Sequence, residues 1–274
     1  MRIAIQGFEG CFHQIAAQSY YGKDTTIEAC ASFGELVKKV RTEKTVDAGI
    51  MAIENSIAGS ILPNYTLLKN SGLHVIGEIY LQIRQHLMVL PGQTMDDIRE
   101  VHSHPMALLQ CLQFLEKYPH IKLVETEDTA LSAKNVHSKK LKSTAAIAGK
   151  LAAEIYGLDI IAPNIQTEKN NYTRFLAISK VPVAPAENAN KASVYFETDH
   201  SIGSLAKVLT SIADAGINLS KLQSFPIPAK QWNYYFHADM EFNDLAHFEK
   251  AKEVILKDAP GMKVLGIYQK GDTH

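Results

Sequence analysis

The chain has few of the features that mark secreted, metal-stabilised or nucleic-acid-binding proteins. Its 274 residues include three cysteines, Cys11, Cys30 and Cys111, which are widely spaced and form no C-x-x-C pair. An odd, scattered set of cysteines argues against a disulfide framework and against a structural zinc site. The formal net charge is −1 and no long run of Lys or Arg occurs, so we expect no nucleic-acid partner.

Long apolar runs are missing as well. The run behind Arg2 covers only residues 3–5, which is too short for the apolar core of a secretory signal, and no later stretch approaches the length that crosses a bilayer. These absences predict a cytoplasmic protein with no membrane contact. The G-x-S-x-G, Walker and H-E-x-x-H motifs are also absent, which disfavours serine hydrolases, P-loop NTPases and zincins.

The first two thirds of the chain alternate short apolar runs with segments of helical period. This alternation predicts an α/β fold with a parallel or mostly parallel sheet covered by helices. We expect strands at residues 2–6, 48–53, 74–78, 86–90, 100–103, 122–126, 143–148, 159–162 and 173–179. We expect helices at residues 12–21, 33–41, 105–118, 128–137 and 149–156.

Residues 181–192, VPVAPAENANKA, have no apolar period and are typical of a linker. The segment behind them predicts the order β-α-β-β-α-β, which is a ferredoxin-like arrangement. Its strands are expected at 193–198, 217–226, 232–242 and 262–269, and its helices at 203–215 and 245–256. Gly216 follows the last helical repeat, where a left-handed glycine commonly ends a helix.

Four polar segments lie where strands end or helices begin. QGFEGCFHQIAA (6–17) places Gly7 and Gly10 ahead of a helix. Such glycines allow backbone N–H groups to approach an anion, and they equally fit a tight turn. IENSIAG (53–59) follows a strand end, where open α/β sheets bind ligands, and an Asn or Ser helix cap fits it equally well.

The other two polar segments carry side chains suited to orienting a substrate. In SHPMALLQC (103–111), Gln110 points either toward the strand ends or toward solvent. His102 and His104 share one face of a strand, but no third ligand is spaced to complete a metal site. In NNYTRF (170–175), Arg174 is suited to clamp a carboxylate, although a polar loop entering an edge strand also explains the segment.

The order and content of these segments resemble one family, prephenate dehydratase. QGFEGCFHQIAA resembles its G-P-x-G-T-F-S element, IENSIAG its P-x-E-N-S-x-x-G element, and SHPMALLQC its S-H-P-Q-A-L-x-Q-C element. DTALSA (128–133) and AAIAGKLAAEIYGL (145–158) resemble its D-T-A-x-A and A-A-I-A-…-Y-G-L segments. NNYTRF resembles N-x-T-R-F, the most specific of the set. Residues 201–226 resemble the G-A-L-x-x-x-L-…-I-N-L-…-E-S-R-P layout of an ACT domain, an amino-acid-sensing module.

The resemblance implies a domain organisation. A catalytic domain over 1–182 would have two α/β lobes like a type II periplasmic binding protein. Lobe one would hold about 1–80 and 160–182, and lobe two about 84–158. The chain would cross between the lobes near 82–86 and 159–163. A ferredoxin-like ACT regulatory domain would follow over 191–274.

The resemblance also implies a reaction, the decarboxylative dehydration of prephenate to phenylpyruvate in phenylalanine biosynthesis. Formation of an aromatic ring drives this step, so neither a cofactor nor a metal is expected. The matching catalytic positions are Thr173, Arg174, Asn55, Ser103, Gln110 and Glu54. We expect Thr173 to donate to the leaving hydroxyl and Arg174 to hold a carboxylate. Glu54 is either a general acid or a structural carboxylate.

The first element departs from the family pattern. Phe8, Cys11 and His13 replace Pro, Thr and Ser, and Met106 replaces a Gln in the third element. Cys11 removes a hydroxyl donor, and His13 adds a titratable group that could take its part. The expected substrate-binding residues are Gly10, Cys11, His13, Ser56 and Phe175.

The C-terminal segment departs as well, since Gln223 and Phe225 replace the Glu and Arg of E-S-R-P. The resemblance implies feedback by phenylalanine bound between paired ACT domains, hence a homodimer or homotetramer. Asn218 would receive the amino group, and loss of the Arg would weaken or alter feedback. The expected phenylalanine-binding residues are Gly203, Ser204, Leu205, Asn218, Leu219, Gln223 and Ser224.

Three alternatives stay open. Arogenate dehydratase performs the same elimination on a substrate with an amino group in place of the keto oxygen. A catalytically silent two-lobed binder is disfavoured by the paired Thr173 and Arg174. A periplasmic solute-binding protein is disfavoured by the lack of a signal-like start.

Overall fold

The computed structural model describes residues 1–198, 200–227 and 233–272. These residues form two compact units: 1–64 with 80–175 make the first, and 65–79 with 176–272 make the second. Trp232, the expected start of a strand, and residues 273–274 lie outside the described residues. The predicted boundary between residues 182 and 191 assigns functional domains and stays a prediction.

The first sheet has strand order β2-β1-β3-β11-β5, with β4 paired to β3. β1 runs parallel to both β2 and β3. The strands are β1 (Arg2–Gln6), β2 (Thr26–Cys30), β3 (Ala48–Asn55), β4 (Gly59–Ser60), β5 (His74–Gln82) and β11 (Tyr172–Ser179), and the helices are α1 (Phe12–Tyr21), α2 (Phe33–Thr42) and α3 (Leu62–Ser71). β2, β4 and α3 were not predicted, because their short sequences carry no clear apolar period.

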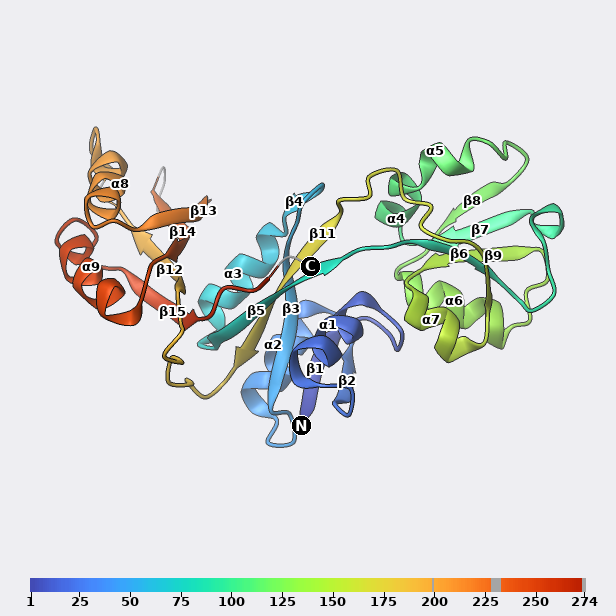
Figure 1. Cartoon of the computed structure of the whole chain (residues 1–274), viewed down its shortest axis with the longest axis horizontal. Helices are drawn as coiled ribbons and strands as arrows, with labels where there is room; N and C mark the ends of the chain where they lie inside the picture. Colours follow the sequence, from blue (N-terminus) through green and yellow to red (C-terminus); the bar gives the residue numbers. More distant parts are fainter. Residues whose placement is uncertain (199, 228–232, 273–274) are drawn as a thin grey trace. The chain divides into compact units, whose positions relative to one another are not determined.

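The second sheet has strand order β10-β6-β9-β7-β8. Its strands are β6 (His86–Val89), β7 (Glu100–Ser103), β8 (Lys122–Glu125), β9 (Thr144–Ala148) and β10 (Asp159–Ala162), and the helical segments are η1 (Met95–Asp97), α4 (Pro105–Gln110), α5 (Leu112–Leu115), α6 (Thr129–Ser138) and α7 (Lys150–Tyr156). Helices α6 and α7 lie on one side of the sheet and α4 and α5 on the other (Figure 1).

The second sheet is mixed, which corrects the expected mostly parallel sheet. β7 runs parallel to β8 and β9, whereas β6 runs antiparallel to β9 and β10. Parallel neighbours need a crossover connection, usually a helix. β6 enters this sheet directly from β5 through residues 83–85, without such a helix, and therefore takes the opposite direction.

Two segments connect the sheets, residues 83–85 and 163–171. They are hydrogen-bonded to each other. The Ile83 N–H donates to the Asn171 carbonyl at 2.7 Å, and the Ile165 N–H donates to the Gln85 carbonyl at 2.8 Å. The Gln85 N–H donates to Gln166 Oε1 at 3.0 Å. These bonds hold the residues that follow β5 beside the residues that lead into β11.

The C-terminal part of the second unit has the predicted order β-α-β-β-α-β. Its elements are β12 (Lys191–Glu197), α8 (Ser204–Asp214), β13 (Asn218–Pro226), β14 (Tyr234–Glu241), α9 (Leu245–Asp258) and β15 (Lys263–Tyr268), and its strand order is β13-β14-β12-β15. This is the ferredoxin-like arrangement. Gly216 has a φ of 73°, as expected for the residue that ends α8.

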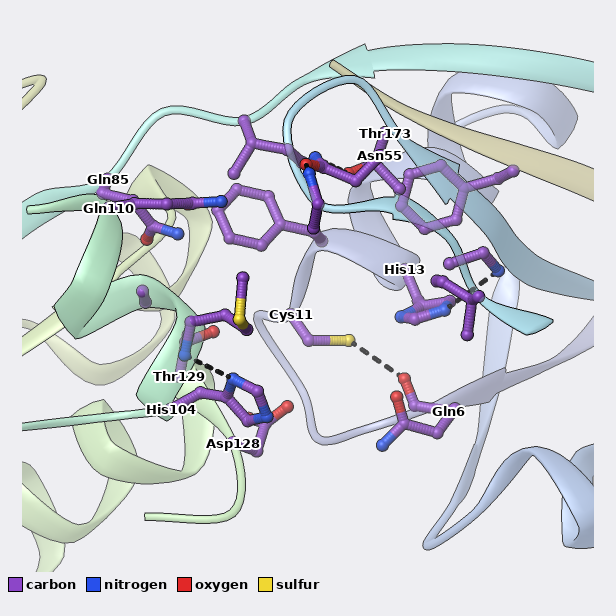
Figure 2. Close-up of a pocket in the computed structure, with 18 of the residues that line it drawn as sticks. Gln6, Cys11, His13, Asn55, Gln85, His104, Gln110, Asp128, Thr129 and Thr173 are labelled. Atoms are coloured by element: carbon purple, nitrogen blue, oxygen red, sulfur yellow. Dashed lines mark hydrogen bonds between the residues drawn. The ribbon is translucent and has the colours of Figure 1, made fainter. Parts of the chain in front are cut away.

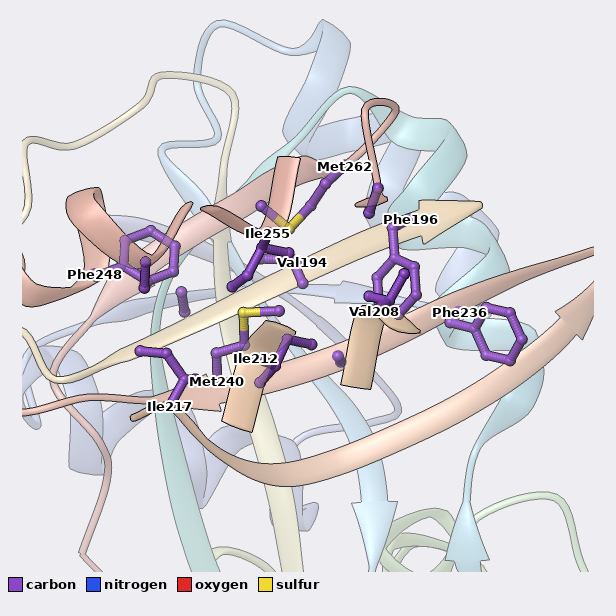
Figure 3. Close-up of a cluster of buried hydrophobic side chains, with 14 of the residues drawn as sticks. Val194, Phe196, Val208, Ile212, Ile217, Phe236, Met240, Phe248, Ile255 and Met262 are labelled. Carbon is purple, nitrogen blue, oxygen red and sulfur yellow. The ribbon is translucent and has the colours of Figure 1, made fainter. Parts of the chain in front are cut away.

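The core of this C-terminal sheet lies between its strands and helices α8 and α9. Val208 and Ile212 of α8 pack with Phe236 and Met240 of β14 (Figure 3). Successive side chains of a strand face opposite sides, so His237 and Asp239, which are also buried, lie on the other face of β14. Burial of such apolar side chains is the main source of stability for so small a sheet.

Candidate active site

The first unit contains a cavity of about 330 Å³, within the usual range for small-molecule sites. It is lined from three sides: by the ends of β1 and β3 with the start of β11, by the connecting segment at Ile83 and Gln85, and by α4 with the starts of α1 and α6 (Figure 2). The ends of neighbouring strands meet at one edge of a sheet, and this is where open α/β folds bind ligands.

The structure brings six of the predicted catalytic and substrate-binding residues to this cavity: Asn55, Thr173, Gln110, Cys11, His13 and Phe175. They come from four different segments of the chain, so only the fold places them together. Five other predicted residues are not among the described residues that line it: Glu54, Ser56, Gly10, Ser103 and Arg174.

Asn55 holds Thr173 in a defined orientation. Asn55 Nδ2 donates to Thr173 Oγ1 at 3.0 Å, to Asn171 Oδ1 at 2.7 Å and to the Tyr172 carbonyl at 3.2 Å. Asn55 Oδ1 accepts from the backbone N–H groups of residues 57 and 58. Because Thr173 Oγ1 accepts from an amide, its own hydrogen is available to donate into the cavity.

Ser56 supports this arrangement from outside the cavity. Its hydroxyl accepts from the Tyr172 N–H at 2.9 Å and donates to the Asn170 carbonyl at 3.3 Å. The Ser56 N–H donates to the Tyr172 carbonyl at 2.8 Å. Ser56 therefore fixes the backbone that leads into Thr173 instead of lining the cavity.

Ser103 and Arg174 point elsewhere for reasons of strand geometry. Ser103 is fully buried, and its hydroxyl donates to the Ile147 carbonyl at 2.6 Å. Arg174 lies on β11 between two residues that line the cavity, Thr173 and Phe175. Successive side chains of a strand face opposite sides, so Arg174 is directed away from them. Its side chain is 4% exposed.

Gly10 serves the turn and not an anion. Its N–H donates to Gln14 Oε1 at 2.7 Å, so this backbone donor is already used. Its φ is +89°, and a Cβ would lie 2.9 Å from Ala152 Cα. The tight-turn interpretation of the first element is therefore the one that the geometry favours.

The two unusual residues of the first element are both uncharged. Burial, and next the nearby Asp128 carboxylate, raise the pKa of the Cys11 thiol to about 12. Burial lowers the pKa of His13 to about 3. His13 Nε2 accepts from the Ala52 N–H at 3.3 Å, and its ring packs edge-on against Phe175. A neutral imidazole without a free Nε2 is a poor general base.

Sequence reasoning missed several lining residues, namely Gln6, Gln85, His104, Asp128 and Thr129. The sequence indicated Asp128 only as part of the D-T-A segment and not as a site residue. It caps α6, since its Oδ1 accepts from the Leu131 N–H at 2.8 Å. Its pKa is raised by burial. The D-T-A sequence is a recognisable helix start, and this signal could have located Asp128 but not its exposure to the cavity.

The second unit holds part of the predicted phenylalanine set. Ser204 and Leu205 line a small cavity of about 170 Å³ together with Tyr234 and Phe236. The described residues around this cavity do not include Gly203, Asn218, Leu219, Gln223 or Ser224. The Asn218 amide donates to Glu241 Oε2 at 3.4 Å, and Gln223 Nε2 donates to the Ser224 carbonyl at 3.2 Å.

Within the described ranges, none of the helices is long and apolar enough to span a bilayer.

Three proteins that are similar to this chain bear on its function. Arogenate dehydratase/prephenate dehydratase 2, chloroplastic, of Arabidopsis thaliana is 35% identical over 291 residues, which cover 100% of this chain and 74% of the relative.

Two solved structures have the same fold over nearly the whole chain. One is described as "GqqA- a novel type of quorum quenching acylases", with a TM-score of 0.90, 27% identity and 98% coverage of both chains. The other is prephenate dehydratase from Arthrobacter aurescens in complex with L-Phe, with a TM-score of 0.89 and 25% identity. It covers 98% of this chain and 90% of that one.

The family model for prephenate dehydratase matches residues 3–199. The match includes every element that lines the candidate active-site cavity, from the end of β1 to β11. The chain therefore belongs to the prephenate dehydratase family of carbon–oxygen lyases.

Proposed function

We propose that this chain catalyses the decarboxylative dehydration of a prephenate-type substrate and that phenylalanine regulates it through the C-terminal ferredoxin-like domain, an ACT domain. One observation carries the catalytic half. The Thr173 hydroxyl is oriented by Asn55 so that its hydrogen is free to donate into a cavity of substrate size.

The reaction breaks two bonds and forms an aromatic ring. The bond between the ring and its carboxylate breaks, CO2 leaves, and the electron pair enters the ring. The opposite C–O bond breaks, and the departing hydroxide takes a proton from solvent to become water. Because the ring itself accepts the electrons, the protein needs only to bind the substrate and stabilise the departing oxygen.

Thr173 suits the second task. A threonine hydroxyl is too weak an acid to give up its proton, but it can donate a hydrogen bond to an oxygen on which negative charge develops. Its side chain is 9% exposed, so few waters compete for that bond. An oriented donor in such a site lowers the barrier without reorganising.

The start of α1 is suited to binding the substrate. Its N-cap residue, Cys11, makes no capping hydrogen bond with its side chain, and the thiol is neutral because burial raises its pKa to about 12. The partial positive charge of the helix N-terminus is therefore not cancelled by its own cap. Phe12 and His13 line the cavity at this helix start, which can hold a substrate carboxylate.

Arg174, Glu54 and Ser103 remain predictions for catalytic roles. We propose that Ser103 and Arg174 act through the strands that carry Ile147 and Thr173, since neither lines the cavity. Direct substrate contact by Asn55 and Gln110 fits their positions on the cavity wall.

Contacts made by residues of α3 support the regulatory half. The Tyr65 ring on α3 packs against the His237 ring at 4.7 Å, and Thr66 Oγ1 lies 3.3 Å from Tyr235 OH. The neighbouring Asn64 donates to the Ala52 carbonyl at 2.7 Å. Ala52 in turn binds His13 in the cavity wall. A shift of α3 would therefore move a cavity residue.

A second lead is amide hydrolysis, because one solved relative is described as an acylase. Such chemistry needs an activated nucleophile. Cys11 is neutral and donates to the Gln6 carbonyl at 3.7 Å, and His13 Nε2 is occupied by the Ala52 N–H. The described cavity residues thus offer no Cys–His pair of the required kind, which disfavours acylase activity here.

Turnover by the purified chain tests both halves. We expect formation of the aromatic product without added metal and inhibition by phenylalanine. Turnover that phenylalanine does not affect would contradict the regulatory half alone. Absence of turnover together with tight substrate binding in calorimetry would indicate a silent binder. Light scattering with and without phenylalanine would test the proposed homodimer or homotetramer.

A further inference from the structure

The cavity has few means to neutralise a dianion. Among the described residues that line it, none is a lysine or an arginine, whereas Glu127 and Asp128 both line it. Arg174, the expected carboxylate clamp, is not one of the lining residues. A substrate with two carboxylates and no positive group would meet two further carboxylates here, and His104 is the one lining residue whose charge opposes that of Asp128 among the described residues.

Asp128 lines the cavity at the start of α6. Oδ1 caps α6 through the Leu131 N–H at 2.8 Å, and the carboxylate also accepts from the Ala130 N–H. Oδ2 lies 3.1 Å from the position of a Cβ on Gly7. The negative charge of Asp128 also acts on Cys11 in the cavity wall: burial, and next this charge, raise the pKa of the Cys11 thiol. A cation placed beside Oδ2 would relieve this repulsion.

A second acceptor lies on the same cavity. Gln85 is 3% exposed and lines the cavity, and its buried Oε1 has no hydrogen-bond partner within the described part of the chain. A buried acceptor without a partner destabilises the folded chain. If the amide is turned by half, this oxygen takes the place of Nε2 and can accept from a ligand N–H. Both acceptors favour a ligand that brings hydrogen-bond donors.

The two candidate substrates differ at one group. Prephenate carries a keto oxygen, which only accepts hydrogen bonds, and two negative charges. Arogenate carries an ammonium group at that place, which donates three hydrogen bonds and halves the net charge. We propose that Asp128 is a specificity-determining residue that binds this ammonium group, so that the chain prefers the amino-acid substrate over the keto acid. The proposal rests on the dehydratase function proposed above.

The ordinary explanation of Asp128 is that it only caps α6. Asparagine caps helices about as well as aspartate, so Asp128→Asn separates the two roles. A cap role alone leaves the ratio of the two specificity constants unchanged. An ammonium-binding role changes that ratio.

The test is kcat/KM of the full chain for arogenate and for prephenate, in the wild type and in Asp128→Asn. The control is Glu125→Gln, which removes an exposed carboxylate of β8 outside the cavity. We expect the wild type to prefer arogenate by at least about tenfold. Asp128→Asn should lower kcat/KM for arogenate about 10- to 100-fold, the effect of a lost hydrogen bond to a charged group. The same change should leave kcat/KM for prephenate equal to the wild-type value or higher. Glu125→Gln should change kcat/KM for neither substrate.

Two results would overturn the proposal: preference of the wild type for prephenate, or an equal loss on both substrates in Asp128→Asn. If neither compound is turned over, the dehydratase function itself fails. Calorimetric dissociation constants of the same two compounds then decide the inference alone. Tighter binding of arogenate that Asp128→Asn abolishes supports it, and equal or weaker binding of arogenate refutes it.

Discussion

Replacement of Thr173 by valine would test the catalytic assignment most directly. Valine keeps the shape of threonine and removes the hydroxyl, so the change takes away the hydrogen that points into the cavity. Removal of one oriented donor to a developing oxyanion costs about 2.7–4 kcal/mol, or about 10²–10³ in kcat. We therefore expect Thr173→Val to lose turnover on this scale, with KM changed much less.

The structure predicts that the fold survives this change. Asn55 Nδ2 loses Thr173 Oγ1 at 3.0 Å but keeps Asn171 Oδ1 at 2.7 Å and the Tyr172 carbonyl at 3.2 Å. The cost in unfolding free energy should stay near about 1 kcal/mol, the net value of one hydrogen bond. Thermal unfolding of the variant measures this directly.

The assay is initial-rate formation of the aromatic product at saturating substrate. Thr173→Ser is the matched control, because it keeps the hydroxyl and should retain most of the rate. Turnover of Thr173→Val within threefold of the wild type would refute the assignment of Thr173 as the donor. Equal losses in the serine and valine variants would show that the methyl group matters, not the hydroxyl.

Three further predictions concern residues away from the reacting atoms. Ser103→Ala should lower the unfolding free energy by about 1–3 kcal/mol, because it takes this donor from the buried Ile147 carbonyl, and should lower kcat far less than Thr173→Val, because Ser103 acts only through the strand that carries Ile147. Lys191→Met should destabilise the chain by about 3–5 kcal/mol in denaturant unfolding, because it removes the ammonium group that neutralises the buried Glu78 carboxylate; adding Glu78→Gln should restore much of this loss. The His13 imidazole should show no titration between pH 5 and 8 in NMR, because burial lowers its pKa to about 3. Since this folded pKa lies below the ordinary value, the stability it contributes should be present above about pH 6.5 and be lost as the pH falls toward 3.

Much of the fold could be predicted from the sequence, because strands and helices with a clear apolar period can be recognised from neighbouring residues alone. The bounds of β1, β7, β10 and α1 were predicted to the residue. The order β-α-β-β-α-β behind the linker and the left-handed Gly216 were also predicted. These features depend on neighbours along the chain, which the sequence displays directly.

Strand direction and short elements could not be predicted in this way. β6 runs antiparallel because the chain enters its sheet through residues 83–85 without a crossover helix, and no local pattern encodes that path. α3 escaped notice because its apolar residues have no strong helical period, yet it carries Tyr65 and its contacts with His237.

The sequence by itself determined which residue types were available for the site, and tertiary structure decided which of them face the cavity. Thr173 and Arg174 are neighbours in one motif, but strand alternation sends only Thr173 to the cavity wall. Ser103 looked like a substrate contact and instead binds the Ile147 carbonyl inside the second sheet. Asp128 stood out in the sequence only as the first residue of the D-T-A segment, and only the folded chain places it on the cavity wall. Side-chain direction and burial depend on contacts between distant segments, and these appear only when the chain is folded.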